Sequence, residues 1–202
     1  MAGDRAGLLA GLVCSRLCHD LVGPAGAVAN GLELCSDLAM VESALEVIET
    51  TTDQLNRRLS FYRRAYGTGT GLTWDDAHNL IQRYVEGSRH VVTWVQGADA
   101  EDGRDDLRAK LVMNLVLCAL AVLPSGGEVT VMAGREPSLS LKGKLGDIEP
   151  MPTAFRSADA TLDDLSPREV QPYLTAILAR DLGGNLTVDV TDVDSLVIAF
   201  LR

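Results

Sequence analysis

Residues 9–35 read LAGLVCSRLCHDLVGPAGAVANGLELC, and their apolar side chains recur every three or four positions. At about 100° per residue, these positions fall within one helical stripe about 140° wide. The members of the stripe are Leu9, Val13, Leu17, Leu21, Pro24, Val28, Leu32 and Cys35. The spacing therefore predicts one long amphipathic helix from about Arg5 to Asp37.

Residues 41–66 repeat the pattern more regularly, in alternating steps of four and three, which is the spacing of a heptad seam. The members of this seam are Val41, Leu45, Ile48, Thr52, Leu55, Leu59, Tyr62 and Tyr66. Because only Ser36–Met40 separates the two predicted helices, they should pack antiparallel. Two helices alone cannot bury both apolar stripes. We therefore expect a homodimer, in which two hairpins form a four-helix bundle across a two-fold axis.

The chain changes character after Gly67, Gly69 and Gly71, which are typical of a linker. Beyond them, the patterns predict helices at 75–86 (capped near Thr73), 104–123 and 167–182 (capped by Ser166). They predict strands at 90–95, 128–133, 138–145, 185–190 and 196–201. This order favours an α+β sandwich, with helices on one face of a single sheet. The expected domains are residues 1–68, the helical hairpin, and residues 72–202, the sandwich.

The composition argues against two classes of partner. Among 202 residues, 28 Asp and Glu outnumber 18 Lys and Arg, which gives a formal net charge of −10. Nucleic acids and anionic lipid surfaces both require a basic face, so we expect neither as a partner. No apolar run approaches the roughly 20 residues that span a bilayer. The four cysteines are expected to be reduced, buried small hydrophobes.

The N-terminal apolar segment has a second interpretation. Residues 6–14 resemble a short secretory segment, with Cys14 as a site of lipidation. However, Val13 is not the small residue expected before such a cysteine, Asp4 interrupts the positive start, and the periodicity continues past Leu21. These flanks favour a helix of a cytoplasmic protein.

His19 lies about 200° from the apolar stripe of the first helix and should therefore face outward. Its neighbours on that face are Ser15, Gly23, Gly26 and Asn30. A glycine inside a helix costs about 1 kcal/mol of helix stability relative to alanine. The presence of both Gly23 and Gly26 is explained if the surface of another protein has to approach the helix backbone closely. Pro24 removes an intrahelical hydrogen bond, so the helix should bend just after His19.

The residues beside His19 suit a nucleophilic imidazole. Imidazole is largely neutral near pH 7, so it can act as a nucleophile without burial or a metal. Asp20 can orient the tautomer of His19 or stabilise its charged form, and Arg16 can contact a phosphoryl oxygen. We therefore take His19, Arg16 and Asp20 as the candidate catalytic residues.

Other interpretations of these residues remain open. An exposed histidine on a helix is commonly incidental. A zinc site built from Cys14, Cys18 and His19 requires converging ligands, whereas the two thiols and the imidazole should point to different sides of the helix. The second helix carries four arginines that form either a solvated face or a surface that holds an acidic partner: Arg57, Arg58, Arg63 and Arg64.

Three segments carry a family resemblance: Ser15–Pro24 (SRLCHDLVGP), Gly26–Ala27 (GA) and Asn30–Leu34 (NGLEL). They resemble the phosphoacceptor helix of the ChpT-type histidine phosphotransferases of alphaproteobacteria. More loosely, they resemble the corresponding helix of sensor histidine kinases, where H-[DE]-L-x-x-P is typical. The resemblance implies a dimerising hairpin followed by a degenerate ATPase-like domain. It also implies that the histidine relays phosphoryl groups between receiver domains of a hybrid histidine kinase and of response regulators.

The second half resembles a kinase ATPase domain that has lost its nucleotide site. Lys110–Ala119 (KLVMNLVLCA) is similar to the N-box N-L-x-x-N-A, with Asn114 in the first position. The second asparagine is replaced by Cys118, a poor ligand for Mg²⁺ and triphosphate. The Asp-x-Gly-x-Gly box and the glycine-rich lid are both missing, whereas Asp181–Leu186 resembles the closing turn of that fold.

The resemblance thus implies a phosphotransferase in which His19 takes a phosphoryl group from one receiver aspartate and passes it to another, without ATP. We expect no cofactor or metal on this chain, and Mg²⁺ on the partner receiver domain. The receiver should dock on Ser15, Val22, Gly23, Gly26, Ala27 and Asn30. Two rival functions remain: an ATP-dependent histidine kinase core, and a non-catalytic scaffold that binds response regulators.

Overall fold

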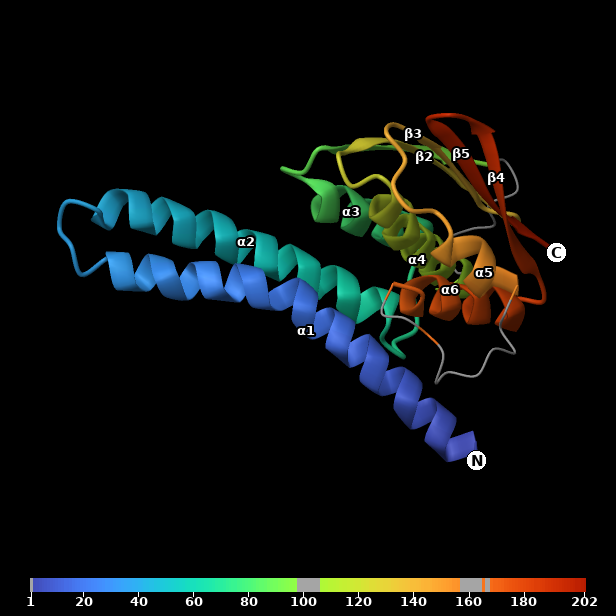
Figure 1. The fold of residues 1–202 in the computed structure, drawn as a ribbon, viewed down its shortest axis with the longest axis horizontal. Coiled ribbons are helices and arrows are strands. Elements are labelled where there is room, and N and C mark those ends of the chain that lie inside the picture. The colour runs from blue at the N-terminus through green and yellow to red at the C-terminus, as the bar shows by residue number, and fades with distance from the viewer. Residues whose placement is uncertain (1, 98–105, 157–164, 166–167) are drawn as a thin grey trace. The chain divides into compact units, whose positions relative to one another are not determined.

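The computed structural model of the chain describes residues 2–97, 106–156, 165 and 168–202. The chain forms two compact units, Met1–Arg63 and Arg64–Arg202 (Figure 1). The division falls in the last turn of the second helix, whereas the sequence placed the end of the first domain at residue 68.

The first unit is a hairpin of two long helices, α1 (Ala2–Leu34) and α2 (Val41–Ala65). They run antiparallel, as predicted, and residues 35–40 connect them in a series of turns (Figure 1). Gly31 marks a close approach of the two helices, because a Cβ added there would lie 2.6 Å from Cγ1 of Ile48.

Helix α1 bends along its length, and its N-terminal part diverges from α2 (Figure 1). Pro24 lies inside the helix. It cannot donate the hydrogen bond that would continue the helical ladder, and its ring crowds the preceding turn. The prediction that α1 bends is confirmed (Figure 1).

A single hairpin leaves large apolar side chains in solvent. Leu32 of α1 is 61% exposed, and Leu45 and Leu59 of α2 are 54% and 45% exposed. The expectation of buried cysteines is wrong for Cys14 and Cys18, which are exposed because α2 does not cover the flank of α1 that carries them. Cys118 of the second unit is buried, as expected.

The first helix also passes one test for a membrane-spanning segment. Gly7–Leu34 is long and apolar enough to cross a membrane, judged by length and composition alone. The segment carries Arg16 and Asp20 near its centre, and charged side chains at that depth of a bilayer are costly.

The second unit contains a five-stranded sheet and four helices among its described residues. The strands are β1 (His90–Gln96), β2 (Gly127–Ala133), β3 (Ser138–Lys142), β4 (Asn185–Asp192) and β5 (Ser195–Leu201). The helices are α3 (Trp74–Val85), α4 (Asp106–Val122), α5 (Pro150–Arg156) and α6 (Val170–Asp181). The strand order is β1-β2-β3-β5-β4, in which β1 and β2 are parallel and the other neighbours antiparallel.

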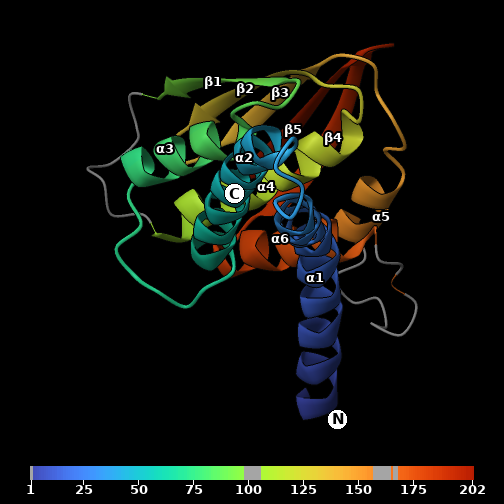
Figure 2. The same ribbon diagram turned by 90° about the vertical axis from the view of Figure 1, so that its left-hand side faces the viewer.

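The helices of this unit cover one face of the sheet (Figure 2). Helix α3 packs on β1, α4 on β2 and β3, and both α5 and α6 on β4. Alternate residues of the strands, such as Val131, Leu139 and Ile198, are buried on the covered face. The predicted α+β sandwich is confirmed.

Several element boundaries differ from the prediction for local reasons. Thr73 caps α3 in a reciprocal capping box with Asp76, as expected near that residue. Strand β3 ends at Lys142 instead of residue 145, because Gly143 has φ +148° and its amide donates to the carbonyl of Asp194. Helix α5 was not predicted. The expected cap at Ser166 lies outside the described residues.

The glycine segment before α3 is held by the second unit. The amide of Gly71 donates to Oδ2 of Asp106 at 2.8 Å, and Nζ of Lys110 donates to the carbonyl of Gly69 at 2.8 Å. Both partners lie on α4. The residues read as a linker are therefore tied to the sandwich over at least part of their length.

Candidate functional site

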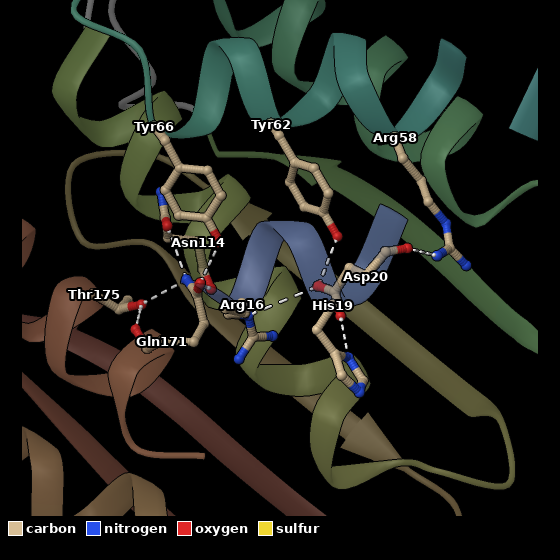
Figure 3. A network of polar contacts seen from close by, with 9 residues as sticks. All are labelled: Arg16, His19, Asp20, Arg58, Tyr62, Tyr66, Asn114, Gln171 and Thr175. Carbon is tan, nitrogen blue, oxygen red and sulfur yellow. Dashed lines mark hydrogen bonds and ion pairs between the residues drawn. The ribbon is translucent and has the colours of Figure 1, made fainter. Parts of the chain in front are cut away.

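His19 projects from α1 into solvent, with 88% of its side chain exposed. Its Nδ1 lies 3.5 Å from Oδ1 of Asp20, the next residue (Figure 3). An ionised carboxylate can only accept a hydrogen bond, so this contact requires the proton of the neutral imidazole to be on Nδ1. The lone pair of the ring is then on Nε2.

Asp20 is held in place by two residues of α2. The hydroxyl of Tyr62 donates to Oδ2 of Asp20 at 3.0 Å, and Nη1 of Arg58 donates to the Asp20 carbonyl at 2.7 Å (Figure 3). This carbonyl would ordinarily accept from the amide four residues later, but that residue is Pro24, which has no N–H. Arg58 thus replaces the donor that proline removes.

These two supports were missed from the sequence. Arg58 was grouped with three other arginines as either a solvated face or a surface for an acidic partner, and Tyr62 was assigned only to the apolar seam. A signal for Arg58 existed, since an internal proline leaves one carbonyl without its helical donor. No comparable signal identified Tyr62, because its reach to Asp20 depends on the register of the two helices.

Arg16 lies one turn before Asp20 and is mostly buried, with 22% of its side chain exposed. Its Nε is 3.9 Å from Oδ2 of Asp20 and has no hydrogen-bond partner among the described residues. The sequence predicted that Arg16 could reach a phosphoryl oxygen. In the structure its Nε faces the Asp20 carboxylate. The Tyr62 hydroxyl lies closer to the same carboxylate than Arg16 does.

The predicted docking residues line an open face of α1. Ser15, Val22, Gly23, Gly26 and Asn30 are exposed, and Ala27 is half-buried. A Cβ added at Gly23 or Gly26 would meet no described atom within 4 Å. Packing within the described chain therefore gives no reason for these two glycines, in contrast to Gly31.

The other candidate chemistry finds no support in the described part of the chain. No group of three or more His, Cys, Asp or Glu side chains there could hold a metal ion. The ring of His78 stacks on Trp94 with centroids 5.0 Å apart, and Nε2 of His90 lies 2.8 Å from the carbonyl oxygen of Leu123. Of the arginine cluster, Arg57 pairs with Asp53 at 3.5 Å.

The second unit contains a separate, closed polar network around Asn114 (Figure 3). Asn114 is fully buried. Its Nδ2 donates to the carbonyls of Lys110 at 2.8 Å and Ala65 at 3.1 Å, and its Oδ1 accepts from Nε2 of Gln171 at 2.8 Å. The amide group at the first N-box position is thus engaged by the protein itself.

The network extends from Gln171 to three further side chains. The Tyr66 hydroxyl donates to Oε1 of Gln171, and the Thr175 hydroxyl donates to the Gln171 carbonyl at 2.7 Å. Sγ of Cys118, at the second N-box position, lies 3.5 Å from Oγ1 of Thr175. Both residues of the N-box pattern therefore contribute to internal packing of the sandwich.

Comparisons with known proteins agree on one relationship. Residues 74–194 match the histidine phosphotransferase C-terminal domain family. The chain is 30% identical over 195 residues to a protein phosphotransferase ChpT from Brucella abortus (strain 2308), covering 92% of each. A solved structure described as a bacterial phosphotransferase matches with a TM-score of 0.79 and 27% identity, over 96% of this chain and 95% of that one.

Proposed function

The chain belongs to the histidine phosphotransferase family, and we propose that His19 is the residue that carries the phosphoryl group. The protein is a phosphotransferase of a phosphorelay, and its partners are receiver domains. The exposed imidazole of His19 supports the assignment most directly, because a phosphoryl donor can approach it from solvent.

In the proposed reaction, Nε2 of His19 attacks the phosphorus of a phosphoaspartate on a donor receiver. The P–N bond forms as the P–O bond to the aspartate breaks, and the aspartate leaves as a carboxylate. The aspartate of a second receiver then attacks the phosphohistidine, which restores the neutral imidazole. Transfer of this kind depends mainly on positioning and charge neutralisation.

Asp20 is the proposed orienting group. Its carboxylate keeps the proton on Nδ1 and stabilises the positive charge that develops on the ring as Nε2 bonds to phosphorus. We assign Arg16 the smaller role of balancing the Asp20 charge in the free protein and of turning to a phosphoryl oxygen when a receiver is bound. We propose that this chain binds no metal, and that Mg²⁺ on the receiver neutralises the phosphoryl oxygens.

We place the receiver on the open face of α1, over Ser15, Val22, Gly23, Gly26, Ala27 and Asn30. The absence of side chains at Gly23 and Gly26 allows a helix of the receiver to approach the α1 backbone closely. This close approach would offset the roughly 1 kcal/mol that each glycine costs the isolated helix.

We also propose that the hairpin dimerises into a four-helix bundle. The support is the exposure of Leu32, Leu45 and Leu59, apolar positions of the two predicted seams. Burying one such leucine is worth about 1.5–3 kcal/mol. The same arrangement would use the apolar side of α1 within a soluble, cytoplasmic dimer and not in a membrane.

Transfer without ATP is the last part of the proposal. Asn114 is buried, and both polar atoms of its side-chain amide are engaged within the sandwich. A nucleotide could use this amide only by breaking those hydrogen bonds. Titration with Mg-ATP should therefore give no binding at millimolar nucleotide, and autophosphorylation from ATP alone would favour the kinase alternative instead.

The test of the relay is a two-step transfer with labelled phosphate. A panel of receiver domains from the source organism, phosphorylated with acetyl phosphate, is mixed with the chain, and a second, unphosphorylated receiver is then added. Label should enter the wild-type chain and leave it, and His19→Gln should accept none. His78→Gln and His90→Gln are the matched controls and should transfer normally. A scaffold would carry no label and would retain full partner function in His19→Gln.

A further inference from the structure

Tyr62 occupies a position that couples α2 to the chemistry of α1. Its side chain is 5% exposed, and its ring packs edge-on against Phe61 with centroids 6.1 Å apart. The hydroxyl reaches out of this packing to Oδ2 of Asp20 at 3.0 Å. The anchor is therefore a rigid, buried side chain, and it does not belong to the helix that carries His19.

A carboxylate is planar, so fixing one oxygen limits where the other can lie. Tyr62 holds Oδ2, and Oδ1 is left facing Nδ1 of His19 at 3.5 Å. The backbone of the same aspartate is fixed independently, because Arg58 donates to its carbonyl. Asp20 is thus restrained at both its side chain and its main chain, whereas His19 itself is 88% exposed and has no comparable packing.

We propose that Tyr62 is a positioning residue for phosphoryl transfer: its hydroxyl fixes the Asp20 carboxylate, which in turn keeps the proton of His19 on Nδ1 and the nucleophilic lone pair on Nε2. This inference rests on the proposed role of His19. It assigns to α2 a part in the reaction that goes beyond building the bundle.

Without the Tyr62 hydroxyl, the carboxylate loses its shortest contact. Arg16 Nε, 3.9 Å from the same oxygen, is then free to draw Oδ2 toward itself. Rotation of the carboxylate moves Oδ1 away from Nδ1, so a larger share of the neutral imidazole carries its proton on Nε2. That tautomer cannot attack phosphorus through Nε2. The loss of a hydrogen bond to a charged group corresponds to a rate loss of about tenfold.

The test uses the full chain and a small phosphoryl donor, so that no partner protein is needed. Phosphoramidate phosphorylates imidazole directly: its P–N bond breaks, ammonia leaves, and the new P–N bond forms at the ring. The rate at saturating donor is measured for wild type and Tyr62→Phe, together with the ¹⁵N chemical shifts of the His19 ring nitrogens in the unphosphorylated chain. Tyr62→Phe should lower the rate about tenfold and reverse the order of the two ¹⁵N shifts, because a tenfold loss by this route makes the Nε2–H tautomer the major one.

Tyr66→Phe is the matched control. It removes one tyrosine hydroxyl four residues further along the chain, just after α2, but that hydroxyl bonds Gln171 in the other network. It should leave the rate and the ¹⁵N shifts of His19 unchanged. In an Asp20→Asn background, Tyr62→Phe should have little further effect, because the group it positions is gone.

Two results would overturn the inference: wild-type ¹⁵N shifts with a wild-type rate in Tyr62→Phe, or an equal loss in Tyr66→Phe. Neither result bears on whether His19 exchanges phosphoryl groups with receivers. Conversely, if receivers fail to label His19 while the ¹⁵N shifts respond to Tyr62→Phe, the proposed function fails and the positioning contact stands.

Discussion

Two tyrosines, Tyr62 in the last turn of α2 and Tyr66 just after the helix, take part in two different polar networks. Tyr62 bonds Asp20, and that network ends on an exposed imidazole with one ring nitrogen directed to solvent. Tyr66 bonds Gln171, and that network ends on Asn114, a buried amide whose polar atoms are all used within the sandwich. Both networks are built from polar side chains. What distinguishes them is whether the terminal group is left free to meet a ligand.

The largest effect is expected where the closed network is opened. Asn114→Leu removes the donor to two carbonyls and the acceptor of Gln171. Losing three hydrogen bonds of a buried network should lower the free energy of unfolding by about 2–4 kcal/mol, although Gln171 keeps its weaker contacts with Thr175 and the Asn114 carbonyl. Chemical denaturation measures the loss, and transfer by the remaining folded protein should be normal. A variant that keeps its stability but loses transfer would show that the closed network has a functional role.

The next largest effect is expected from a substitution that covers the docking face of α1 around His19. Gly26→Trp places a large side chain on the exposed face of α1. Because this side chain should displace the docked receiver, the rate of phosphoryl transfer between receiver and His19 should fall about 100-fold. Sedimentation should show an intact dimer. Gly7→Trp is the control, because an added Cβ there also meets no described atom and the site lies three helical turns before His19. Equal losses in both variants would remove the docking surface from the account.

A smaller effect is expected from removing the hydrogen bond between Arg58 and the Asp20 carbonyl. Arg58→Met leaves the Asp20 carbonyl without a donor and should cost about 1–2 kcal/mol of stability. In a Pro24→Ala background, the new amide can donate to that carbonyl, so the same Arg58 change should cost much less. Denaturation of the four proteins of this double-mutant cycle measures the coupling. Additive losses would mean that Arg58 does not compensate for Pro24.

The smallest effect is expected for stability, when two glycines of α1 are each replaced by alanine. Gly23→Ala should stabilise the protein by up to about 1 kcal/mol, because the helix gains propensity and the new Cβ meets no described atom. Gly31→Ala should destabilise it, because the Cβ would lie 2.6 Å from Ile48. Thermal unfolding of the two variants measures the difference. Destabilisation by Gly23→Ala would indicate that this face is already packed in the dimer.

The sequence predicted most of the fold because its signals are local. Period-3.6 patterns located α1 and α2, and alternating apolar residues located all five strands. Helix α5 is seven residues long and has no periodicity to detect. The outward direction of His19 followed from its angle to the apolar stripe.

The supports of the site were not predictable in the same way. The contacts of Asp20 with Tyr62 and of Tyr66 with Gln171 join residues 42 and 105 positions apart. Such contacts depend on helix register and tertiary packing, which no single segment encodes. The same holds for the exposure of Cys14 and Cys18, since only the path of α2 decides which flank of α1 is covered.

The most direct test of the account is to locate the phosphoryl group on the intact chain. After incubation with a phosphorylated receiver, mass spectrometry identifies the modified residue, and ³¹P–¹⁵N correlation in a labelled sample identifies the bonded ring nitrogen. We expect one phosphoramidate, on Nε2 of His19. A phosphoryl group on another residue, or on Nδ1 of His19, would contradict it.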